Sequence, residues 1–420
     1  MKILVITNLF PNNKEPNRGV FNRQQVAELA KLCEVEVVAP VAWHRARGIA
    51  EEEPLILTLS PEGRGNKGEG DLTVYHPRYF MVPKIGRALY GFFFYLGIIR
   101  KVREIYKTFK FDMILATWAY PDGFGAALVS NALKKPLVIK VHGSDVNITS
   151  EYFLRRKMMV YAFKRAQKII AVSSALKQKI TELGIPGRKI EVITNGVDTG
   201  LFKPMDKIEC RKKLNLPLDK KIILFVGNLE KVKGIDLLVE AMRGLPEDVY
   251  LVVVGKGSLK NTLMSNSRHC ERVKRTKQSY EIASLAFGLL AMTKEKSLTM
   301  AHEMEDRIWF FGARPHDEIP VWMNAADVFC LPSRNEGCPN VILEALACGT
   351  PIAASNAGGI PELIKSKEFG ILVSTEDSNA LEQGINRCLA SGRDKNKSRD
   401  SVLNMSWQKN AEQIFNLLNG

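Results

Sequence analysis

Short apolar runs alternate along the chain with segments of helical spacing. The first run spans Lys2 to Thr7, and a polar loop follows it. The apolar positions of Phe21 to Leu32 then recur at the three- and four-residue spacing of a helix, and a second apolar run covers Val35 to Ala39. A buried strand, a helix and another buried strand in this order predict a parallel sheet of the doubly wound α/β class.

The same alternation continues along the chain and starts afresh after about residue 200. We expect further buried strands at residues 113–117, 137–141, 168–173, 189–193, 221–226, 249–254, 307–311 and 327–331. Two successive series of strands and helices predict two α/β domains, each built on its own parallel sheet. The last apolar pattern, from Ser406 onward, has helical spacing.

Two segments of the first half depart from this alternation. Residues 44–72 are acidic and then rich in glycine, which predicts a flexible surface loop. Lys84 to Lys110 combines clustered aromatic residues with basic ones. Such a helix can lie in a membrane interface, or it can be a core helix with a solvated basic face. We favour the core helix, because the apolar part is nearly continuous rather than one-sided.

Composition and charge narrow the class of protein. The chain has 420 residues, 45% of them apolar and 25% charged, as in a soluble globular protein with room for two full cores. Its net charge of +15 is concentrated in residues 1–200, which hold 30 Lys and Arg against 18 Asp and Glu. A basic surface attracts anionic lipids, nucleic acids or acidic substrates. Without a nucleic-acid motif, we expect lipid headgroups or a phosphorylated acceptor, and a merely solubilising charge is an equal alternative.

Cysteine usage and hydropathy bear on the compartment. Seven cysteines are scattered without a C-x-x-C pair, which indicates reduced thiols rather than a disulfide framework or a zinc site. The longest apolar run, Ala88 to Ile99, has 12 residues, well short of the roughly 20 that span a bilayer. We therefore expect a cytoplasmic protein without a transmembrane helix, whose basic half could contact the inner face of the membrane.

The most informative stretch spans Ser333 to Pro361, SRNEGCPNVILEALACGTPIAASNAGGIP. A loop that carries Glu336 leads here from an apolar run into a predicted helix that contains Glu344. The N-terminus of a helix favours phosphate, whereas carboxylates accept hydrogen bonds from sugar and ribose hydroxyls. A nucleotide sugar presents both kinds of group. Two carboxylates at this spacing, taken alone, are more often a capping acid and a surface acid.

The residue types of this stretch are more specific than the spacing of its two glutamates. E-G-C-P-N-V-I-L-E-A-L-A-C-G-T-P, followed by G-G-I-P-E, resembles the donor-site signature of the retaining GT-B glycosyltransferases of the GT4 type, the glycosyl transferases group 1. The resemblance implies two Rossmann-like domains that face a central cleft. The run I-T-N-G-V-D-x-x-x-F-K-P resembles the family's junction between them.

The resemblance also sets the expected domain organisation. An acceptor-binding domain would cover residues 1–203, and a nucleotide-sugar-binding domain would cover residues 204–390. The final segment, 391–420, would form a helix that packs back toward the first domain. Residues 264–305 depart from the family pattern, and we interpret them as a surface insertion.

Roles for individual residues follow from the same resemblance. Glu336 would orient the donor sugar, His142 in the run H-G-S-D would contact it, and Lys233 would stabilise the leaving diphosphate. Positions that bind the donor are implied at Glu344, Asn228, Gly19, Gly337, Cys338, Asn340 and Val341. Glu344 would hold the ribose hydroxyls. Asn228 stands where the family has an arginine, and its side chain can donate hydrogen bonds but carries no charge.

The implied reaction is transfer of a hexose-type sugar from a nucleotide diphosphate sugar to a saccharide or lipid-linked acceptor. The family transfers with retention of the anomeric configuration. For this chain we expect a role in the synthesis of cell-surface polysaccharides or glycolipids. No cofactor is expected. Because the chain has no D-x-D motif, no metal is expected either.

Three other functions can be weighed against this one. A dinucleotide-dependent oxidoreductase should show G-x-G-x-x-G after the first strand, and TNLFPNN stands there instead. A hexosamine-nucleotide epimerase shares the two-domain cleft but not the signature phrase. A catalytically weak homologue that binds nucleotide sugars or assists assembly remains the alternative, supported by Asn228 and the insertion.

Overall fold

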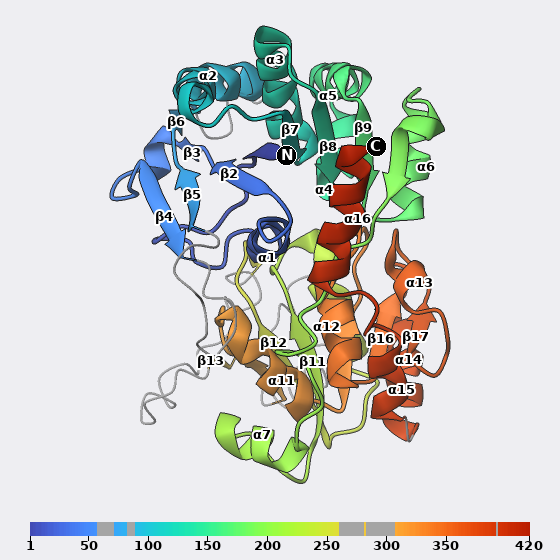
Figure 1. Cartoon of the computed structure of the whole chain (residues 1–420). Coiled ribbons are helices and arrows are strands. Elements are labelled where there is room, and N and C mark those ends of the chain that lie inside the picture. Colours follow the sequence, from blue (N-terminus) through green and yellow to red (C-terminus); the bar gives the residue numbers. More distant parts are fainter. Residues whose placement is uncertain (57–70, 82–88, 260–280, 283–306, 392–393) are drawn as a thin grey trace. The chain divides into compact units, whose positions relative to one another are not determined.

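The computed structural model describes residues 1–56, 71–81, 89–259, 281–282, 307–391 and 394–420 (Figure 1). The chain forms two compact units. The first comprises Met1–Gly196 and Met405–Gly420, and the second comprises Val197–Asn404. The chain thus enters the second unit a few residues before the expected position 203, and it returns to the first unit after 404 rather than after 390.

The first unit is built on one large sheet. Its elements are β1 (Lys2–Ile6), α1 (Val20–Leu29), β2 (Glu34–Val38), β3 (Val41–Ala42), β4 (Glu52–Ile56), β5 (Asp71–Tyr75), β6 (Arg78–Tyr79), α2 (Tyr90–Thr108), β7 (Met113–Thr117), α3 (Phe124–Leu133), β8 (Leu137–Val141), α4 (Ser144–Asn147), α5 (Phe153–Arg165), β9 (Lys168–Ala171), α6 (Ser174–Glu182), β10 (Ile190–Val192) and α16 (Trp407–Asn419). In the described part, the sheet order is β10-β9-β8-β7-β1-β2-β5-β4, and β3 pairs separately with β6. Every pair in the large sheet is parallel except β4 with β5.

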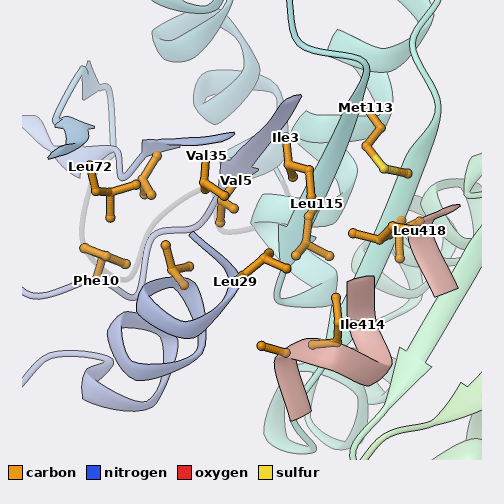
Figure 2. Close-up of a cluster of buried hydrophobic side chains, with 14 of the residues drawn as sticks. Ile3, Val5, Phe10, Leu29, Val35, Leu72, Met113, Leu115, Ile414 and Leu418 are labelled. Carbon is orange, nitrogen blue, oxygen red and sulfur yellow. The ribbon is translucent and has the colours of Figure 1, made fainter. Parts of the chain in front are cut away.

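The core of the first unit joins the two ends of the chain. Leu29 of α1 and Ile414 and Leu418 of α16 pack against apolar side chains of the central strands, including Val5 and Leu115 (Figure 2). Side chains four residues apart lie on one face of a helix, so the spacing of Ile414 and Leu418 directs both toward the sheet. The C-terminal helix is therefore part of the first unit.

The second unit repeats the pattern. Its elements are α7 (Lys207–Leu214), β11 (Lys221–Val226), α8 (Ile235–Ala241), β12 (Val249–Val254), β13 (Glu281–Ile282), β14 (Ile308–Phe310), α11 (Ile319–Ala325), β15 (Val328–Leu331), α12 (Asn340–Cys348), β16 (Ile352–Ser355), α13 (Ile360–Leu363), β17 (Gly370–Val373), α14 (Ser378–Ala390) and α15 (Lys395–Asp400). Among the described residues, the sheet order is β13-β14-β12-β11-β15-β16-β17. All its pairs are parallel except β13 with β14. Two parallel α/β sheets confirm the predicted fold class.

The predicted insertion at 264–305 lies outside the described residues except for β13. The surface loop predicted at 44–72 is wrong in part, because Glu52–Ile56 form β4, paired antiparallel with β5. Residues 57–70 lie outside the described part. The sequence EEPLI has no alternating pattern and contains a proline. At the edge of the sheet, however, a strand tolerates a residue that lacks an N–H donor.

Helix α2 decides between the two interpretations of the aromatic segment. Phe94, Ile98, Val102 and Ile105 are buried and recur at helical spacing. The helix therefore packs one apolar face into the first unit, as the favoured interpretation of a core helix expects, while Phe92 and Leu96 outside that face are exposed. Among the described residues, no helix has both the length and the apolar character needed to cross a membrane.

Candidate functional site

Glu336 lies in the loop that connects β15 with α12. Its side chain is only 8% exposed, and its Oε1 accepts hydrogen bonds from Nζ of Lys233 at 2.6 Å and from Oγ of Ser333 at 2.7 Å. The structure thus brings together two side chains for which the sequence predicted separate roles. A lysine can bind a negatively charged group of a ligand. The carboxylate beside it can stabilise positive charge on the same ligand.

A close approach between two loops places Lys233 beside Glu336. Lys233 ends a short 3₁₀ turn, and the next residue, Gly234, has φ +67°. A Cβ atom on Gly234 would lie 1.9 Å from the carbonyl oxygen of Pro332, so only glycine fits there. The loop after β11 therefore lies directly on the loop that carries Glu336.

Arg334 fastens the same two loops to each other. Its guanidinium forms two hydrogen bonds to the carboxylate of Asp236, at 2.8 and 2.9 Å. Its backbone N–H donates to the carbonyl of Val232 at 2.8 Å. A bidentate pair of this kind fixes orientation as well as distance. Lys233 and Glu336 are thus positioned by residues that the sequence pattern did not single out.

The second part of the signature, G-G-I-P-E, lies against the backbone of Glu336. Gly358 has φ +52°, and a Cβ atom on it would come within 1.9 Å of the Glu336 carbonyl oxygen. The N–H of Gly359 donates to this oxygen at 3.4 Å. The two phrases of the motif are therefore one site, in which the glycines allow the loop after β16 to support Glu336.

Glu344 is buried on α12, where it forms a pair that the sequence did not reveal. Its Oε1 lies 2.9 Å from Nε2 of His316, whose ring also lies against Phe202. Burial lowers the pKa of His316. The hydrogen bond to Glu344 and the charges of Glu344, Asp198 and Asp317 outweigh burial, so the pKa is raised above its ordinary value.

His316 is a second residue of this site, after Arg334, that sequence reasoning missed. It follows β14, in a polar turn at the carboxyl end of a parallel strand. That position is the one at which open α/β sheets bind ligands, and it is the same kind of position that drew attention to His142. The position of His316 was thus an available signal, but its pairing with Glu344 was not.

The His316–Glu344 pair predicts a pH-dependent stability. A raised pKa in the folded state gives a stabilisation that is full below the unfolded pKa of about 6.5 and is lost as pH rises through the folded pKa. Replacing His316 by Gln should lower the free energy of unfolding by about 1.5–3 kcal/mol at pH 6, as for a charge-assisted hydrogen bond, and by much less at pH 9. Denaturant unfolding at both pH values measures this. The exposed His44→Gln is the control, and an equal loss at both pH values would contradict the prediction.

The remaining donor positions of the second unit surround the mouth of α12. Gly337 and Cys338 are buried in the loop, and Asn340 and Val341 are the first two residues of the helix. The N–H groups of this first turn are at the positive end of the helix dipole. Asn228 follows β11 and is exposed, with its carbonyl accepting the N–H of Glu230 at 2.9 Å.

His142 belongs to the first unit, in a turn held by one carboxylate. Asp145 accepts the backbone N–H groups of His142, Gly143 and Ala119 at 3.0, 2.8 and 2.8 Å. Burial raises the pKa of Asp145 to about 6, although these hydrogen bonds act in the opposite direction. The Asp145 carboxylate therefore holds the backbone of the turn after β8. The ring of His142 is oriented instead by the side chains that pack against it.

The ring of His142 packs against Trp118 and Phe21, with centroid distances of 5.9 and 4.8 Å. Its buried Nε2 has no hydrogen-bond partner among the described residues. Burial, followed by the charge of Lys140, holds the pKa of His142 well below its ordinary value. A neutral imidazole with an unsatisfied nitrogen is suited to a hydrogen bond with a neutral ligand group such as a sugar hydroxyl.

Gly19 belongs to the same unit as His142. It precedes α1 with φ +63°, and a Cβ atom on it would meet the carbonyl oxygen of Leu9 at 2.2 Å. Two residues later, Phe21 packs on His142. The structure therefore groups Gly19 with His142 in the first unit, and it groups the other candidate residues in the second.

A cavity of about 220 Å³ lies beside the Gly19 loop, within the first unit. Its lining includes Glu15, Arg18, Arg45 and His76. Nη1 of Arg18 and Nη2 of Arg45 lie 3.4 and 3.7 Å from the Glu15 carboxylate. Two guanidinium groups thus face one carboxylate, which leaves the cavity with an excess of positive charge.

Comparison with known families covers both units. The model described as Glycosyltransferase Family 4 matches residues 19–201. Two models described as Glycosyl transferases group 1 match residues 206–282 and 270–391. These two group 1 matches overlap at residues 270–282, inside the segment 264–305 that we interpret as an insertion.

Two proteins that resemble this chain in sequence carry the names of glycosyltransferases. The chain is 31% identical over 405 residues to the putative teichuronic acid biosynthesis glycosyltransferase TuaC of Bacillus subtilis, which covers 92% of this chain and 89% of the relative. It is 28% identical over 249 residues to a D-inositol 3-phosphate glycosyltransferase of Acidothermus cellulolyticus, which covers 57% of this chain and 50% of that protein.

Solved structures share the fold. HepE from Anabaena in complex with UDP and glucose matches with a TM-score of 0.69 at 20% identity, covering 100% of this chain and 99% of that one. Sucrose-phosphate synthase from Thermosynechococcus elongatus matches with a TM-score of 0.73 at 21% identity, covering 100% and 98%. At these identities the likeness shows the fold alone, which is GT-B. Since TuaC also aligns with nearly the whole chain, this chain belongs to the GT4-type glycosyltransferases, the glycosyl transferases group 1.

Proposed function

We propose that the protein transfers a hexose-type sugar from a nucleotide diphosphate sugar to a saccharide or lipid-linked acceptor, with retention of the anomeric configuration and without a metal. The observation that carries this proposal is the Lys233–Glu336 pair at the mouth of α12, with Glu344 buried behind it. A cation beside a helix N-terminus suits a diphosphate, and carboxylates suit sugar and ribose hydroxyls. The product would be a cell-surface polysaccharide or glycolipid.

In the proposed reaction, the bond between the anomeric carbon and the phosphate oxygen breaks as the acceptor oxygen bonds to that carbon from the same face. The proton of the acceptor hydroxyl passes to the departing phosphate oxygen. Negative charge grows on the diphosphate, where Lys233 and the N–H groups that open α12 would stabilise it. Lys233 would contact the phosphate while it stays paired with Glu336, and the Glu336 carboxylate would accept a hydrogen bond from a sugar hydroxyl.

The cavity beside the Gly19 loop is our candidate for the acceptor. Its volume of about 220 Å³ suits one sugar unit, and its two arginines suit an acceptor with a phosphate or carboxylate group. TuaC is named for teichuronic acid biosynthesis, which supports a role in polysaccharide or glycoconjugate synthesis. An acceptor carried on a lipid would require the first unit to work at the membrane.

The experiment that tests this function measures nucleoside diphosphate release from UDP-, GDP- and ADP-sugars, in EDTA and without added metal. UDP-glucose is tried first, because HepE is known in complex with UDP and UDP-glucose. We expect slow release from one donor. Glu344→Ala should raise the Kd of that donor roughly 10- to 100-fold, since it removes hydrogen bonds to a charged group.

One control and two contrary outcomes define the test. Glu368→Ala removes an exposed carboxylate of the same unit and should leave donor affinity unchanged. Release that EDTA abolishes would overturn metal independence. Donor binding without release, even with saccharide and lipid acceptors added, would favour the alternative, a nucleotide-sugar-binding or assembly protein.

A further inference from the structure

An apolar ridge protrudes from the first unit where α4 leads into α5. We define the ridge as Ile148, Tyr152, Phe153 and Leu154, four large side chains that are all exposed. Phe153 is 68% exposed, the highest value for any large apolar side chain in the described part of the chain, and Leu154 is 54% exposed. Single exposed apolar residues are common, but several adjacent ones mark a surface that contacts another phase or molecule.

Basic residues accompany this ridge. Arg155, Arg156 and Lys157 follow it directly, and Glu151 is the only acidic residue between positions 148 and 165. The guanidinium of Arg155 lies 3.5 Å from the centroid of the Tyr152 ring, and Nζ of Lys157 lies 4.3 Å from that of Phe153. These three cations form no salt bridge in the described part of the chain. Their charge is therefore available to an external anion.

The apolar surface continues onto α2. Phe124 of α3 links the two helices, with ring centroids 5.1 Å from Phe92 of α2 and 5.8 Å from Tyr161 of α5. Leu96, 63% exposed, extends the outer face of α2 beyond Phe92. Helices α2, α3 and α5 lie next to one another along the upper edge of the first unit (Figure 1). Exposed aromatic and aliphatic side chains therefore form one strip over α5 and α2, and the buried Phe124 of α3 contacts both Phe92 and Tyr161 beneath it.

We propose that this strip docks the first unit on a bilayer that contains anionic phospholipids. Phe153 and Leu154 enter the headgroup region, and Arg155, Arg156 and Lys157 meet the lipid phosphates. Aromatic rings bordered by cations suit a membrane interface, where one end of the side chain is apolar and the other is wet. Clustered basic residues favour a negatively charged leaflet over a neutral one.

The inference rests on the proposed function in one respect, because a lipid-linked acceptor would be presented at this surface. The docking itself needs neither donor nor acceptor. It can therefore be measured on the protein alone, so that a failure of docking and a failure of catalysis are distinguishable.

The test is co-sedimentation of the full chain with phosphatidylcholine vesicles, with and without phosphatidylglycerol, at low and high salt. We expect binding to the anionic vesicles at low salt. Phe153→Ser/Leu154→Ser should reduce the bound fraction at least tenfold, and Arg155→Gln/Arg156→Gln/Lys157→Gln should abolish the preference for anionic lipid. The matched control is Ile208→Ser/Leu218→Ser, at two positions of the second unit that are each 53% exposed, and it should bind as the unsubstituted chain does.

Three results would overturn the proposal. One is equal binding to neutral and anionic vesicles. Another is unchanged binding of the Phe153→Ser/Leu154→Ser variant. The third is sedimentation velocity that shows a dimer which this variant dissociates, because a second copy would then cover the strip. Nucleoside diphosphate release in the same preparations reports folding: lost docking with intact release implicates the strip alone, and intact docking without release counts only against the proposed reaction.

Discussion

Replacing Glu336 by Gln is expected to lower turnover of the nucleotide sugar about 100- to 1,000-fold, as for the loss of one preorganised electrostatic contact in a transition state. Gln is nearly isosteric and can still accept the Ser333 hydroxyl, whose Oγ lies 2.7 Å from Oε1. The substitution removes the negative charge near the carbon that becomes positive during transfer. Donor affinity should therefore weaken far less than turnover. The measurements are kcat from nucleoside diphosphate release and donor Kd from calorimetry.

The controls for this prediction separate charge from position. Ser333→Ala keeps the carboxylate but removes one of the groups that orient it, so a smaller loss of turnover is expected. Glu368→Gln, at an exposed position of the second unit, should change neither quantity. If Glu336→Gln weakened binding and turnover by the same factor, Glu336 would be a plain binding residue, because an interaction made equally in the ground state does not raise kcat.

Local patterns in the sequence predicted much of the fold because they reflect local physics. The apolar run before Ser333 forms β15, and the helix expected after Pro339 forms α12. The loop predicted at residues 44–72 is wrong over β4, because an edge strand needs no alternating pattern and tolerates charges and proline. Its pairing with β5 depends on a partner beyond the intervening glycine-rich segment, which no local window contains.

The junction between the units shows the same limit. The run I-T-N-G-V-D was recognised as the family's junction, but the first unit ends within it, at Gly196. A Cβ atom on Gly196 would lie 2.5 Å from the backbone nitrogen of Trp407, at the start of α16. The end of the first unit is thus set by close packing against a helix from the other end of the chain. Such a contact cannot be inferred from periodicity.

The candidate site was predicted as a set of residues rather than as an arrangement. The resemblance pointed to Glu336, Glu344 and Lys233 as separate residues. It did not reveal the ion pair between Glu336 and Lys233. His316 and the Arg334 clamp were missed because their partners lie far away in the sequence. Residue types and helix positions can be inferred from one sequence, whereas the pairing of charges depends on how loops from different strands meet.

The Lys233–Glu336 pair leads to the second large prediction. Replacing Lys233 by Ala should lower kcat/KM about 1,000-fold, which corresponds to about 4 kcal/mol of transition-state stabilisation. Lys233 is the described cation that reaches Glu336, at 2.6 Å, and it would neutralise the leaving diphosphate. Lys231→Ala is the matched control, because Lys231 lies in the same turn but is exposed, and its loss should change kcat/KM little. Nucleoside diphosphate release at several donor concentrations gives these constants.

The double variant Lys233→Ala/Glu336→Gln tests whether the two side chains act as one unit. Lys233→Ala alone leaves the nearly buried Glu336 carboxylate without its cation, so part of its cost is the uncompensated charge. Adding Glu336→Gln removes that charge. The double variant should therefore lose less activity and less stability than the sum of the single variants. Losses that add in full would mean that the 2.6 Å contact is not maintained while the donor reacts, and that the two residues contribute independently.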